Sequence, residues 1–188
     1  MRTVTYGGAC SLDGFITAAD GSIDWLYFSP DVGEIMATYW KGVDTMLMGR
    51  KTWDVAQAQG GGGAGPASVR TVVFSRTLDR IDVPGVQLVK DDPGAFVRAL
   101  KATKGGNICV MGGGDLARSL FEADVIDEVG FNVHPVLLGS GTPAFLNPKH
   151  RIALELTECR QLRGGCVYVT YRVKHRRAVR SKTRAAEM

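Results

Sequence analysis

Short apolar runs, each followed by a glycine-containing or polar turn, constrain the fold of this chain more than any other feature. They lie at residues 3–9, 45–48 (TMLM), 71–74 (TVVF) and 108–111 (ICVM). Apolar side chains recur at helical spacing between these runs. The helical stripes are Val32, Ile35, Met36, Tyr39 and Trp40, then Phe96, Val97 and Leu100, and then Leu116, Leu120 and Phe121. Because strands that alternate with helices build an α/β sheet, and these runs lack a polar face, we expect a mostly parallel sheet with helices on both faces.

The last third of the chain has a different pattern. Residues 128–134, 155–162 and 166–173 are rich in β-branched and aromatic side chains and predict strands. The Arg163-Gly164-Gly165 segment is typical of the turn that joins two such strands. We therefore expect an antiparallel hairpin at the C-terminal edge of the sheet.

Length and charge predict one domain followed by a basic tail. The chain has 188 residues, which suits a single buried core. Six of its 23 basic residues lie within residues 174–188 with only one acid, and the remainder holds 17 basic against 18 acidic residues. We expect a domain at residues 1–173 and a disordered tail at 174–188. The net charge of +4 thus belongs to the tail, and nucleic acid is not an expected partner.

Membrane insertion and metal binding have no support in the sequence. Residues 129–148 contain no Asp, Glu, Lys or Arg, but their three prolines and three glycines exclude a spanning helix. The N-terminal residues lack the apolar core of a signal peptide, so we expect a cytoplasmic protein without a membrane partner. The four cysteines show no CxxC spacing and the three histidines no metal-binding motif, so we expect no metal.

Three turns that follow apolar strands have the composition of anion sites. Each offers backbone amides, hydroxyls or cations that suit a phosphate. They comprise Gly49, Arg50, Lys51 and Thr52 after TMLM, Ser75, Arg76 and Thr77 after TVVF, and Gly112, Gly113, Gly114 and Asp115 after ICVM. Each turn alone also fits a solvated helix start or tight strand-to-helix packing. Because all three follow strands that should meet at one sheet edge, together they predict a dinucleotide-phosphate site.

Three ordered motifs in these segments resemble the dihydrofolate reductase family. Residues 11–16 (SLDGFI), 48–53 (MGRKTW) and 110–114 (VMGGG) are similar to motifs of its branch that contains the reductase domain of the riboflavin-biosynthesis deaminase-reductase. The resemblance spans residues 2–173 and implies a stand-alone member, because the zinc-deaminase pattern is absent. It implies a dihydrofolate reductase-like three-layer fold, with a mostly parallel twisted central sheet, and NADPH as cofactor.

The resemblance also assigns cofactor contacts. It implies NADPH binding by the three turns named above and by Met111, with Ala9 and Ile16 against the nicotinamide. Arg76 is the cation expected to bind the 2′-phosphate that distinguishes NADPH from NADH. A Rossmann dehydrogenase is the competing dinucleotide interpretation. Its glycine motif fits poorly, because the glycines fall mid-chain in a chain too short for two nucleotide-binding halves.

The substrate side is predicted from fewer residues. Trp25, Pro30 and Asp31 resemble the tryptophan, proline and acid that precede and open the first helix in dihydrofolate reductases, with one extra residue between Trp25 and Asp31. Asp31 is therefore the candidate catalytic acid and, with Trp25, a substrate contact. Asp31 alternatively fits an ordinary helix N-cap, and Glu34 would replace it if it faced solvent.

Two further strand residues and two loops complete the expected site. Asn132 and His134 share a strand face by alternation; Asn132 is a candidate substrate contact, and His134 suits a structural role better. Asp13 is part of the first motif but also of a common Asp-Gly turn. Residues 17–22 are expected to form a loop that closes over the nicotinamide.

The resemblance implies an NADPH-dependent oxidoreductase. The expected reaction is hydride transfer to a pteridine- or pyrimidine-like small molecule, of the dihydrofolate or 5-amino-6-ribosylaminouracil phosphate class. The alternative is a non-catalytic NADP- or nucleotide-binding module with a diverged substrate pocket, because Phe15 stands where the branch commonly has a lysine. A homodimer is expected from the branch, with residues 136–145 as a candidate apolar face.

Overall fold

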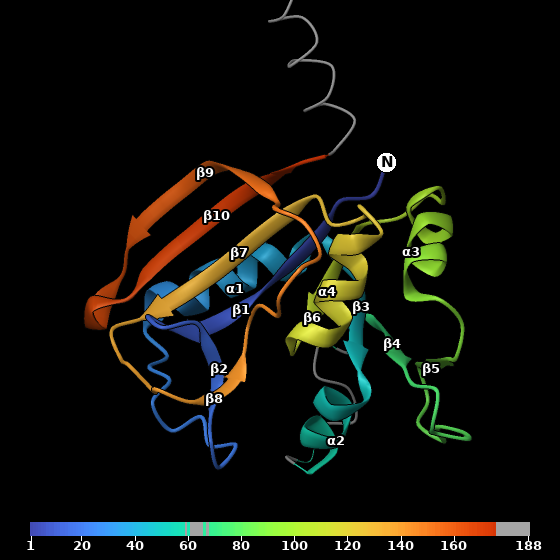
Figure 1. The fold of residues 1–188 in the computed structure, drawn as a ribbon, viewed down its shortest axis with the longest axis horizontal. Coiled ribbons are helices and arrows are strands. Elements are labelled where there is room, and N and C mark those ends of the chain that lie inside the picture. The colour runs from blue at the N-terminus through green and yellow to red at the C-terminus, as the bar shows by residue number, and fades with distance from the viewer. Residues whose placement is uncertain (59, 61–65, 67, 176–188) are drawn as a thin grey trace, which may run out of the picture.

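One twisted sheet of eight strands organises the described part of the chain (Figure 1), in the order β5-β4-β3-β6-β1-β7-β10-β9. The computed structural model describes residues 1–58, 60, 66 and 68–175. The strands are β1 (Val4–Ser11), β2 (Phe15–Ala18), β3 (Val43–Gly49), β4 (Arg70–Phe74), β5 (Val86–Val89), β6 (Asn107–Met111), β7 (Glu128–His134), β8 (Gly141–Pro143), β9 (Ala153–Gln161) and β10 (Val167–Lys174). The helices are α1 (Pro30–Lys41), α2 (Arg50–Ala58), α3 (Pro93–Lys101) and α4 (Gly114–Glu122).

The sheet is parallel from β5 to β7 and antiparallel at its C-terminal edge. β1 pairs in parallel with β6 and β7, and β3 pairs in parallel with β4 and β6. β10 runs antiparallel to both β7 and β9, and a 3-10 turn at Arg163–Gly165 joins β9 to β10. The predicted α/β class, mostly parallel sheet and C-terminal hairpin are confirmed.

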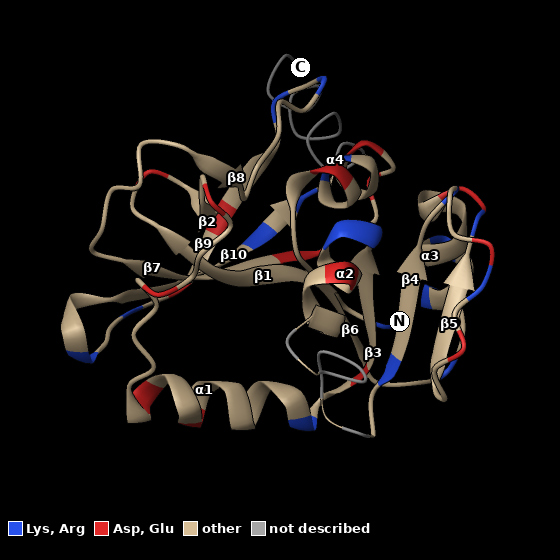
Figure 2. Ribbon diagram, turned by 90° about the horizontal axis from the view of Figure 1, so that it is seen from below, with Lys and Arg blue, Asp and Glu red and all other residues tan. Residues whose placement is uncertain are grey.

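Helices cover both faces of the sheet, as Figure 2 shows for α1 below and α4 above it. Side chains of α3 and α4, such as Val97 and Leu120, pack with Leu47, Val72 and Val110 in the larger apolar core. On the opposite face α2 contributes Trp53 and α1 contributes Tyr39 and Trp40 to a second core with Met46 and Met48 of β3. Alternating strand residues therefore feed two cores, which explains why these strands are apolar throughout.

The sequence analysis missed three short strands. β5 has four residues at the sheet edge, and its side chains from Val86 to Leu88 are only half-buried. β2 and β8 form a separate two-stranded ribbon of four and three residues. Strands of this length have no periodicity that separates them from loops, so only their tertiary pairing defines them.

The C-terminal strand is anchored by charged residues beyond its predicted end. Lys174 is the last residue of β10, and the ring of His175 lies 3.0 Å from an Asp124 oxygen and 3.1 Å from an Asp127 oxygen. Asp127 also binds the buried Lys101 ammonium at 2.5 and 2.7 Å. The folded part therefore extends through His175, past the predicted boundary at residue 173. Residues 176–188 of the expected tail lie outside the described residues.

Candidate functional site

The three predicted anion turns come together at the carboxyl ends of β4, β3 and β6. In the parallel register Gly49 pairs with Phe74, and Met48 pairs with Met111. The residues that follow these positions are thus neighbours at one edge of the sheet. Figure 2 shows the blue first turn of α2, which carries Arg50 and Lys51, beside the start of α4. The predicted meeting of these turns depends on this register, which local sequence alone does not contain.

Arg50 ties the first turn to the turn after β4. Its Nη1 donates to the Thr77 hydroxyl at 2.7 Å, and its Nε lies 3.4 Å from a carboxylate oxygen of Asp54. The buried Ser75 hydroxyl accepts from the backbone amides of Thr77 and Leu78 at 3.2 and 3.1 Å. Ser75 therefore stabilises the turn from a buried position, whereas Arg76 and Thr77, which follow it, are exposed.

Arg76 and Lys51 carry positive charges at this edge that no acidic side chain of the described residues neutralises. Both side chains are exposed, and within residues 1–58 and 68–175 neither makes an ion pair or a hydrogen bond. A cation without a partner keeps its full charge for an incoming anion. Together these two residues give the edge a positive field that suits phosphate groups.

Position 112 requires glycine because of its backbone conformation and its close contact with Thr52. Its φ is +104°, a region that L side chains rarely adopt, and a Cβ built there would lie 1.9 Å from the Thr52 Oγ1 atom. The first turn of α2 therefore packs directly against the turn after β6. The close approach leaves main chain, rather than side chains, lining this part of the edge.

The N-terminus of α4 presents free backbone amides. Gly113 is the N-cap residue and has no side-chain capping hydrogen bond, so no side chain competes for the first amides of the helix. Asp115, in the first turn, is exposed and lies 3.5 Å from the Arg118 guanidinium. The uncapped helix start provides the partial positive charge of an anion site, supported by the glycines before it.

The buried Tyr6 side chain hydrogen-bonds the glycine turn. The sequence analysis did not identify this residue. Its hydroxyl donates to the Gly112 carbonyl at 3.2 Å and to the Ala144 carbonyl. Burial raises the pKa of Tyr6 well above its ordinary value, so it stays a neutral donor. A tyrosine within an apolar strand gives no local sign of this role, because its two partners come from distant segments.

One of the two predicted nicotinamide contacts, Ile16, lies at the same turn. Ile16 of β2 and Thr142 of β8 both approach Gly113: a Cβ at Gly113 would be 4.0 Å from the Ile16 Cδ1 and 3.4 Å from the Thr142 Cγ2. Ala9 of β1 pairs in register with Asn132 of β7. The structure therefore brings Ile16 to the glycine turn and places Ala9 beside a predicted substrate residue.

Trp25, Asn132 and His134 form a buried polar cluster on the α1 face. The Asn132 Nδ2 atom lies 3.1 Å from the His134 Nε2 atom. Because an amide nitrogen can only donate, Nε2 accepts in this hydrogen bond. The Trp25 and His134 rings pack edge to face with centroids 5.4 Å apart. The Trp25 Nε1 and Asn132 Oδ1 atoms are buried and lack a hydrogen-bond partner among the described residues. One unpaired donor and one unpaired acceptor thus remain in this cluster, a costly arrangement without a ligand.

His134 is held in place by its neighbours. The Cys166 Sγ atom and the Tyr27 backbone nitrogen each lie 3.4 Å from its Nδ1. Burial lowers the pKa of His134, which favours the neutral imidazole. These contacts fit the structural role expected for His134.

Asp31 contacts a residue that neither predicted role, catalytic acid or helix N-cap, had identified. Ser29 is the N-cap of α1, and its hydroxyl accepts from the Val32 amide at 3.3 Å, so the interpretation of Asp31 as the cap is wrong. Asp31 instead accepts from the Arg163 amide at 2.9 Å and pairs with the Arg163 Nε at 3.3 Å. Local sequence does not identify this partner, because Arg163 lies in the β9–β10 turn. Glu34 is exposed on the next turn of α1.

The Asp13 carboxylate accepts hydrogen bonds from the segment that follows β7, and we call this set of bonds the Asp13 clamp. One oxygen accepts from the Leu138 amide at 3.1 Å and from the Gly139 amide at 2.8 Å, and the other lies 2.5 Å from the Ser11 hydroxyl. The Ser11 hydroxyl bond and the two amides hold the pKa of Asp13 below its ordinary value. Its role in this structure is therefore to join two loops.

Acidification should release the Asp13 clamp. A carboxyl whose pKa is lowered by folding contributes stability above its unfolded pKa of about 3.9, and loses it as pH falls through the lower folded value. We expect the Leu138 and Gly139 amide resonances to titrate with a midpoint below about 3.9 in NMR spectra. The Asp13→Asn variant should lack this transition. A midpoint at or above the ordinary aspartate value would contradict the clamp.

The expected closing loop is shorter than predicted. Thr17 and Ala18 belong to β2 and pair with Thr142 and Gly141 of β8, and the Thr17 and Thr142 hydroxyls lie 2.9 Å apart. Residues 19–22 form the turn at the end of this ribbon, where the Ser22 amide donates to Asp20 at 2.9 Å. The prediction of a loop from residue 17 onward is wrong, because pairing with a distant segment makes its first two residues part of a strand.

No helix in residues 1–58 and 68–175 is long and apolar enough to span a bilayer. No group of three or more His, Cys, Asp or Glu side chains in this part of the chain has an arrangement that could hold a metal ion.

Comparisons with known proteins agree with this geometry. The family model described as RibD C-terminal domain matches residues 2–168. The uncharacterized protein YyaP of Bacillus subtilis (strain 168) is 32% identical over 181 residues, covering 91% of this chain and 95% of the relative. A crystal structure of a putative riboflavin biosynthesis protein from Shewanella sp. PV-4 superimposes with a TM-score of 0.81 at 25% identity, covering 93% of this chain and 100% of that one. Dihydrofolate reductase from Enterococcus faecalis, complexed with NADP(H), shares the fold with a TM-score of 0.67 at 16% identity, covering 92% and 96%.

Proposed function

Because the chain belongs to the RibD C-terminal domain family, we propose that it is an NADPH-dependent reductase acting on a pteridine- or pyrimidine-like small molecule. The observation that carries this proposal is the convergence of three phosphate-compatible turns at one sheet edge. Arg50 bridges two of these turns through Thr77, and Thr52 packs against Gly112 in the third. Families of this fold use such an edge for a dinucleotide, and the shared fold with the NADP(H)-bound enterococcal enzyme supports the same choice here.

The residues present fit the cofactor. Gly112 and Gly113 place no side chain of their own before the uncapped start of α4, where a diphosphate would bind, and Lys51 and Arg76 are exposed cations that could bind phosphate oxygens. The remaining proposed contacts are Ala9, Ile16, Gly49, Arg50, Thr52, Ser75, Thr77, Met111, Gly114 and Asp115. When bound, NADPH supplies a hydride for a carbon–nitrogen or carbon–oxygen double bond.

Two unpaired atoms of the buried cluster support the proposed substrate class. The Trp25 Nε1 atom is a donor, and the Asn132 Oδ1 atom is an acceptor. A ring lactam, as in pterins and pyrimidinones, carries a carbonyl beside an N–H and complements this pair. We therefore propose that Trp25 and Asn132 orient the heterocycle beside Ala9. Asp31 is the proposed source of the proton that accompanies the hydride.

A direct assay tests this function. Purified protein is mixed with NADPH and either dihydrofolate or the ribosylaminopyrimidinone phosphate, and the fall in NADPH absorbance is followed. Substrate-dependent oxidation with one of the two supports the proposal. Tight NADPH binding in calorimetry without oxidation by either substrate contradicts it for these substrate classes.

A nucleotide-binding module without turnover is the second candidate function. It is favoured by the commitment of Asp31 to Arg163, and by Phe15 where the branch commonly carries a lysine. Under this alternative the cofactor edge binds NADP as before, but the Asn132→Ala and Trp25→Phe variants change no reaction rate, because there is none.

Arg76 should discriminate NADPH from NADH. Loss of one charged hydrogen-bond group in Arg76→Ala should weaken NADPH binding by about 1.5 to 3 kcal/mol. NADH binding should hardly change, because NADH lacks the 2′-phosphate. Calorimetry with both cofactors measures the difference, and Arg172→Ala, which removes an exposed arginine of β10, serves as the control. Equal losses for the two cofactors would show that Arg76 does not contact the 2′-phosphate.

The homodimer and the cytoplasmic location remain proposals. Leu137 and Phe145 at the two ends of the candidate segment are 71% and 51% exposed, which agrees with a use of this face in association. Light scattering after size-exclusion chromatography determines the mass, and a monomer at all concentrations would contradict the dimer.

A further inference from the structure

A cavity of about 400 Å³ lies on the face of the sheet opposite α1. Its walls come from α4, from β7 at Val129, from the segment of residues 144–152 and from β9 at Leu154. The apolar residues that line it are Gly114, Ala117, Phe121, Val129, Ala144, Phe145, Leu146, Pro148, Ile152 and Leu154. This volume falls within the range of about 300–1,000 Å³ that is typical of small-molecule sites.

The cavity is separate from the proposed substrate cluster. Asn132 and His134 point to the α1 face, whereas Val129 of the same strand faces the α4 side, because their positions differ by an odd number of residues. The cavity shares only Gly114 with the proposed cofactor contacts. The mechanism proposed above therefore leaves this space unused.

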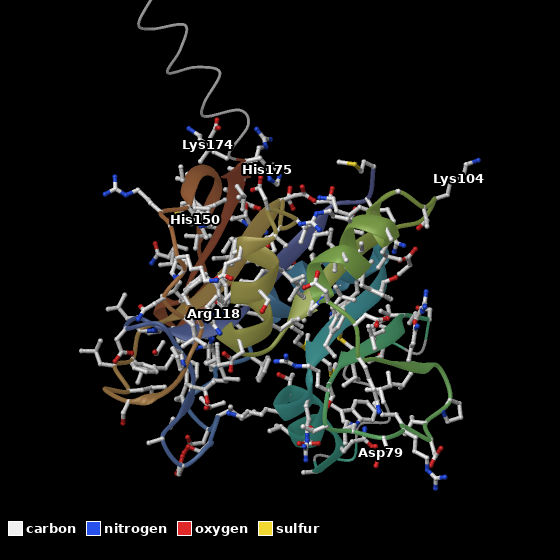
Figure 3. The ribbon with its side chains drawn as sticks, turned by 45° about the vertical axis from the view of Figure 1, so that its right-hand side comes forward. Asp79, Lys104, Arg118, His150, Lys174 and His175 are labelled. Atoms are coloured by element: carbon white, nitrogen blue, oxygen red, sulfur yellow. The ribbon has the colours of Figure 1, made fainter. Side chains whose placement is uncertain are left out.

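Two arginines are the only charged residues that line the cavity within the described part of the chain. Arg118 leaves α4 on the side away from α3 (Figure 3), and Arg151 follows from the segment before β9. The Arg118 Nε atom is buried and has no hydrogen-bond partner among the described residues, although the side chain is 41% exposed. The Arg118 Nη2 atom lies 3.5 Å from a carboxylate oxygen of Asp115. A buried guanidinium donor without an acceptor is unfavourable, and a ligand oxygen would relieve it.

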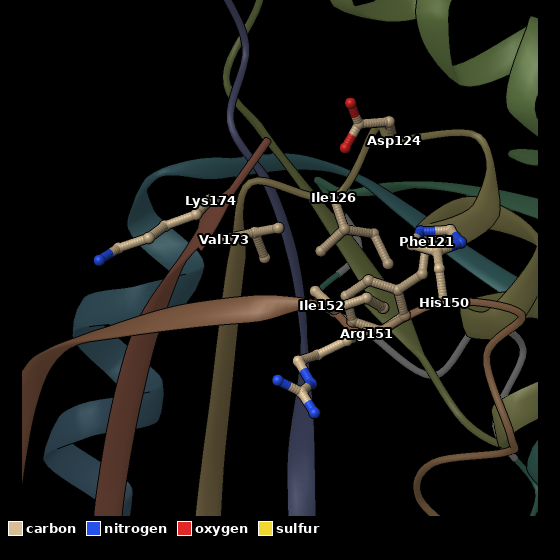
Figure 4. Close-up of a pocket in the computed structure, with 8 residues that line it drawn as sticks. All are labelled: Phe121, Asp124, Ile126, His150, Arg151, Ile152, Val173 and Lys174. Carbon is tan, nitrogen blue, oxygen red and sulfur yellow. The ribbon is translucent and has the colours of Figure 1, made fainter. Parts of the chain in front are cut away.

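A neighbouring hollow is too small to be the site. It has a volume of about 10 Å³, which is enough for about one water. Figure 4 shows Phe121, Arg151 and Ile152 there, the residues that it shares with the larger cavity. The ligand space is therefore on the Ala117 and Leu154 side of these residues.

We propose that this cavity binds a small amphipathic carboxylate. Its apolar body, an alkyl chain or a single ring system, would occupy the space between Ala117, Phe145 and Leu154. Its carboxylate would accept hydrogen bonds from Arg118 and Arg151. With apolar walls and no acid among the lining residues, the cavity disfavours both a cation and a polar sugar or nucleotide.

Calorimetry with decanoate as the probe tests the proposal on the full chain. We expect saturable binding of one decanoate per chain, and binding of decyltrimethylammonium at least about tenfold weaker, because the two arginines repel it. Equal affinity for the two probes, or no binding of decanoate, would overturn the proposal.

Two variants locate the site. Arg118→Ala should weaken decanoate about tenfold or more through the loss of a charged hydrogen bond. Leu154→Asp, at a 41% exposed edge position that folding tolerates, should weaken decanoate by placing a carboxylate at the cavity wall. The matched control Arg172→Ala removes an exposed arginine of β10 and should leave decanoate affinity unchanged. Unchanged binding in both Arg118→Ala and Leu154→Asp would place the ligand elsewhere.

A second copy of the chain is the competing occupant of this face, since Leu156 continues the exposed apolar surface beyond Leu154. Light scattering separates the two occupants. A wild-type dimer that Leu154→Asp converts to a monomer, together with no decanoate binding by the wild-type chain, would show that a partner chain covers the cavity and would overturn the ligand proposal.

Discussion

Replacing Gly112 by alanine should weaken NADPH binding strongly and destabilise the fold. The new Cβ would lie 1.9 Å from the Thr52 Oγ1 and 2.8 Å from the Thr52 Cβ, at a φ of +104°. Strain and overpacking together should lower the free energy of unfolding by about 2 to 4 kcal/mol. Because relief of the clash moves α2 away from the turn, we expect NADPH affinity to fall about 10²-fold.

Gly113→Ala is the matched control for this result. Gly113 has a φ of −75°, and an added Cβ would meet only the flexible Thr142 Cγ2 at 3.4 Å and the Ile16 Cδ1 at 4.0 Å. Its unfolding free energy should change by less than about 1 kcal/mol. Chemical denaturation compares the two variants, and calorimetry follows NADPH. Equal stability of both variants would show that the Gly112 conformation is not required by its contact with Thr52.

Replacing Asp31 by asparagine should lower turnover by about 10²-fold or more, within the range of general acid–base catalysis. The amide keeps an oxygen that can accept from the Arg163 amide, so the fold and NADPH affinity should change little. What the variant loses is the carboxyl proton. Steady-state kinetics with NADPH and the accepted substrate measure kcat.

Arg163→Ala distinguishes a proton-delivering Asp31 from a structural one. This variant removes the ion pair at 3.3 Å but leaves the carboxylate in place. If Asp31 delivers the proton, kcat in Arg163→Ala stays within a few-fold of the wild type. If Asp31 only holds the β9–β10 turn, the two variants lose activity and stability together. Normal kcat in Asp31→Asn removes Asp31 from the mechanism.

Much of the sheet could be predicted because its strands are locally distinctive. The runs that became β3, β4 and β6 are apolar on both faces and end in recognisable turns, and β7 was predicted with its observed bounds. β2, β5 and β8 were missed because three or four residues carry no periodicity. Their strand character comes from partners distant in the chain.

The candidate site likewise contains residues that could be predicted from local sequence and residues that only the structure identified. Arg50, Thr77 and Gly112 were recognised from their motifs, and their contacts depend on the parallel register. Tyr6 was missed, and the partner of Asp31 was unexpected, because each interacts with a segment more than a hundred residues away. Hydrogen bonds over that separation leave no pattern in a short stretch of sequence.

The sequence by itself determined the family, the class of fold and the three turns proposed to bind phosphate, because those features depend on local composition: apolar strands, glycines and cations in fixed order. The tertiary structure alone decided where Asp31 and Asp13 direct their carboxylates, which polar atoms of Trp25 and Asn132 remain unpaired, and that a cavity with two arginines opens beside α4. These features arise from packing between distant segments. Burial, desolvation and unpaired donors exist only once those segments are in contact.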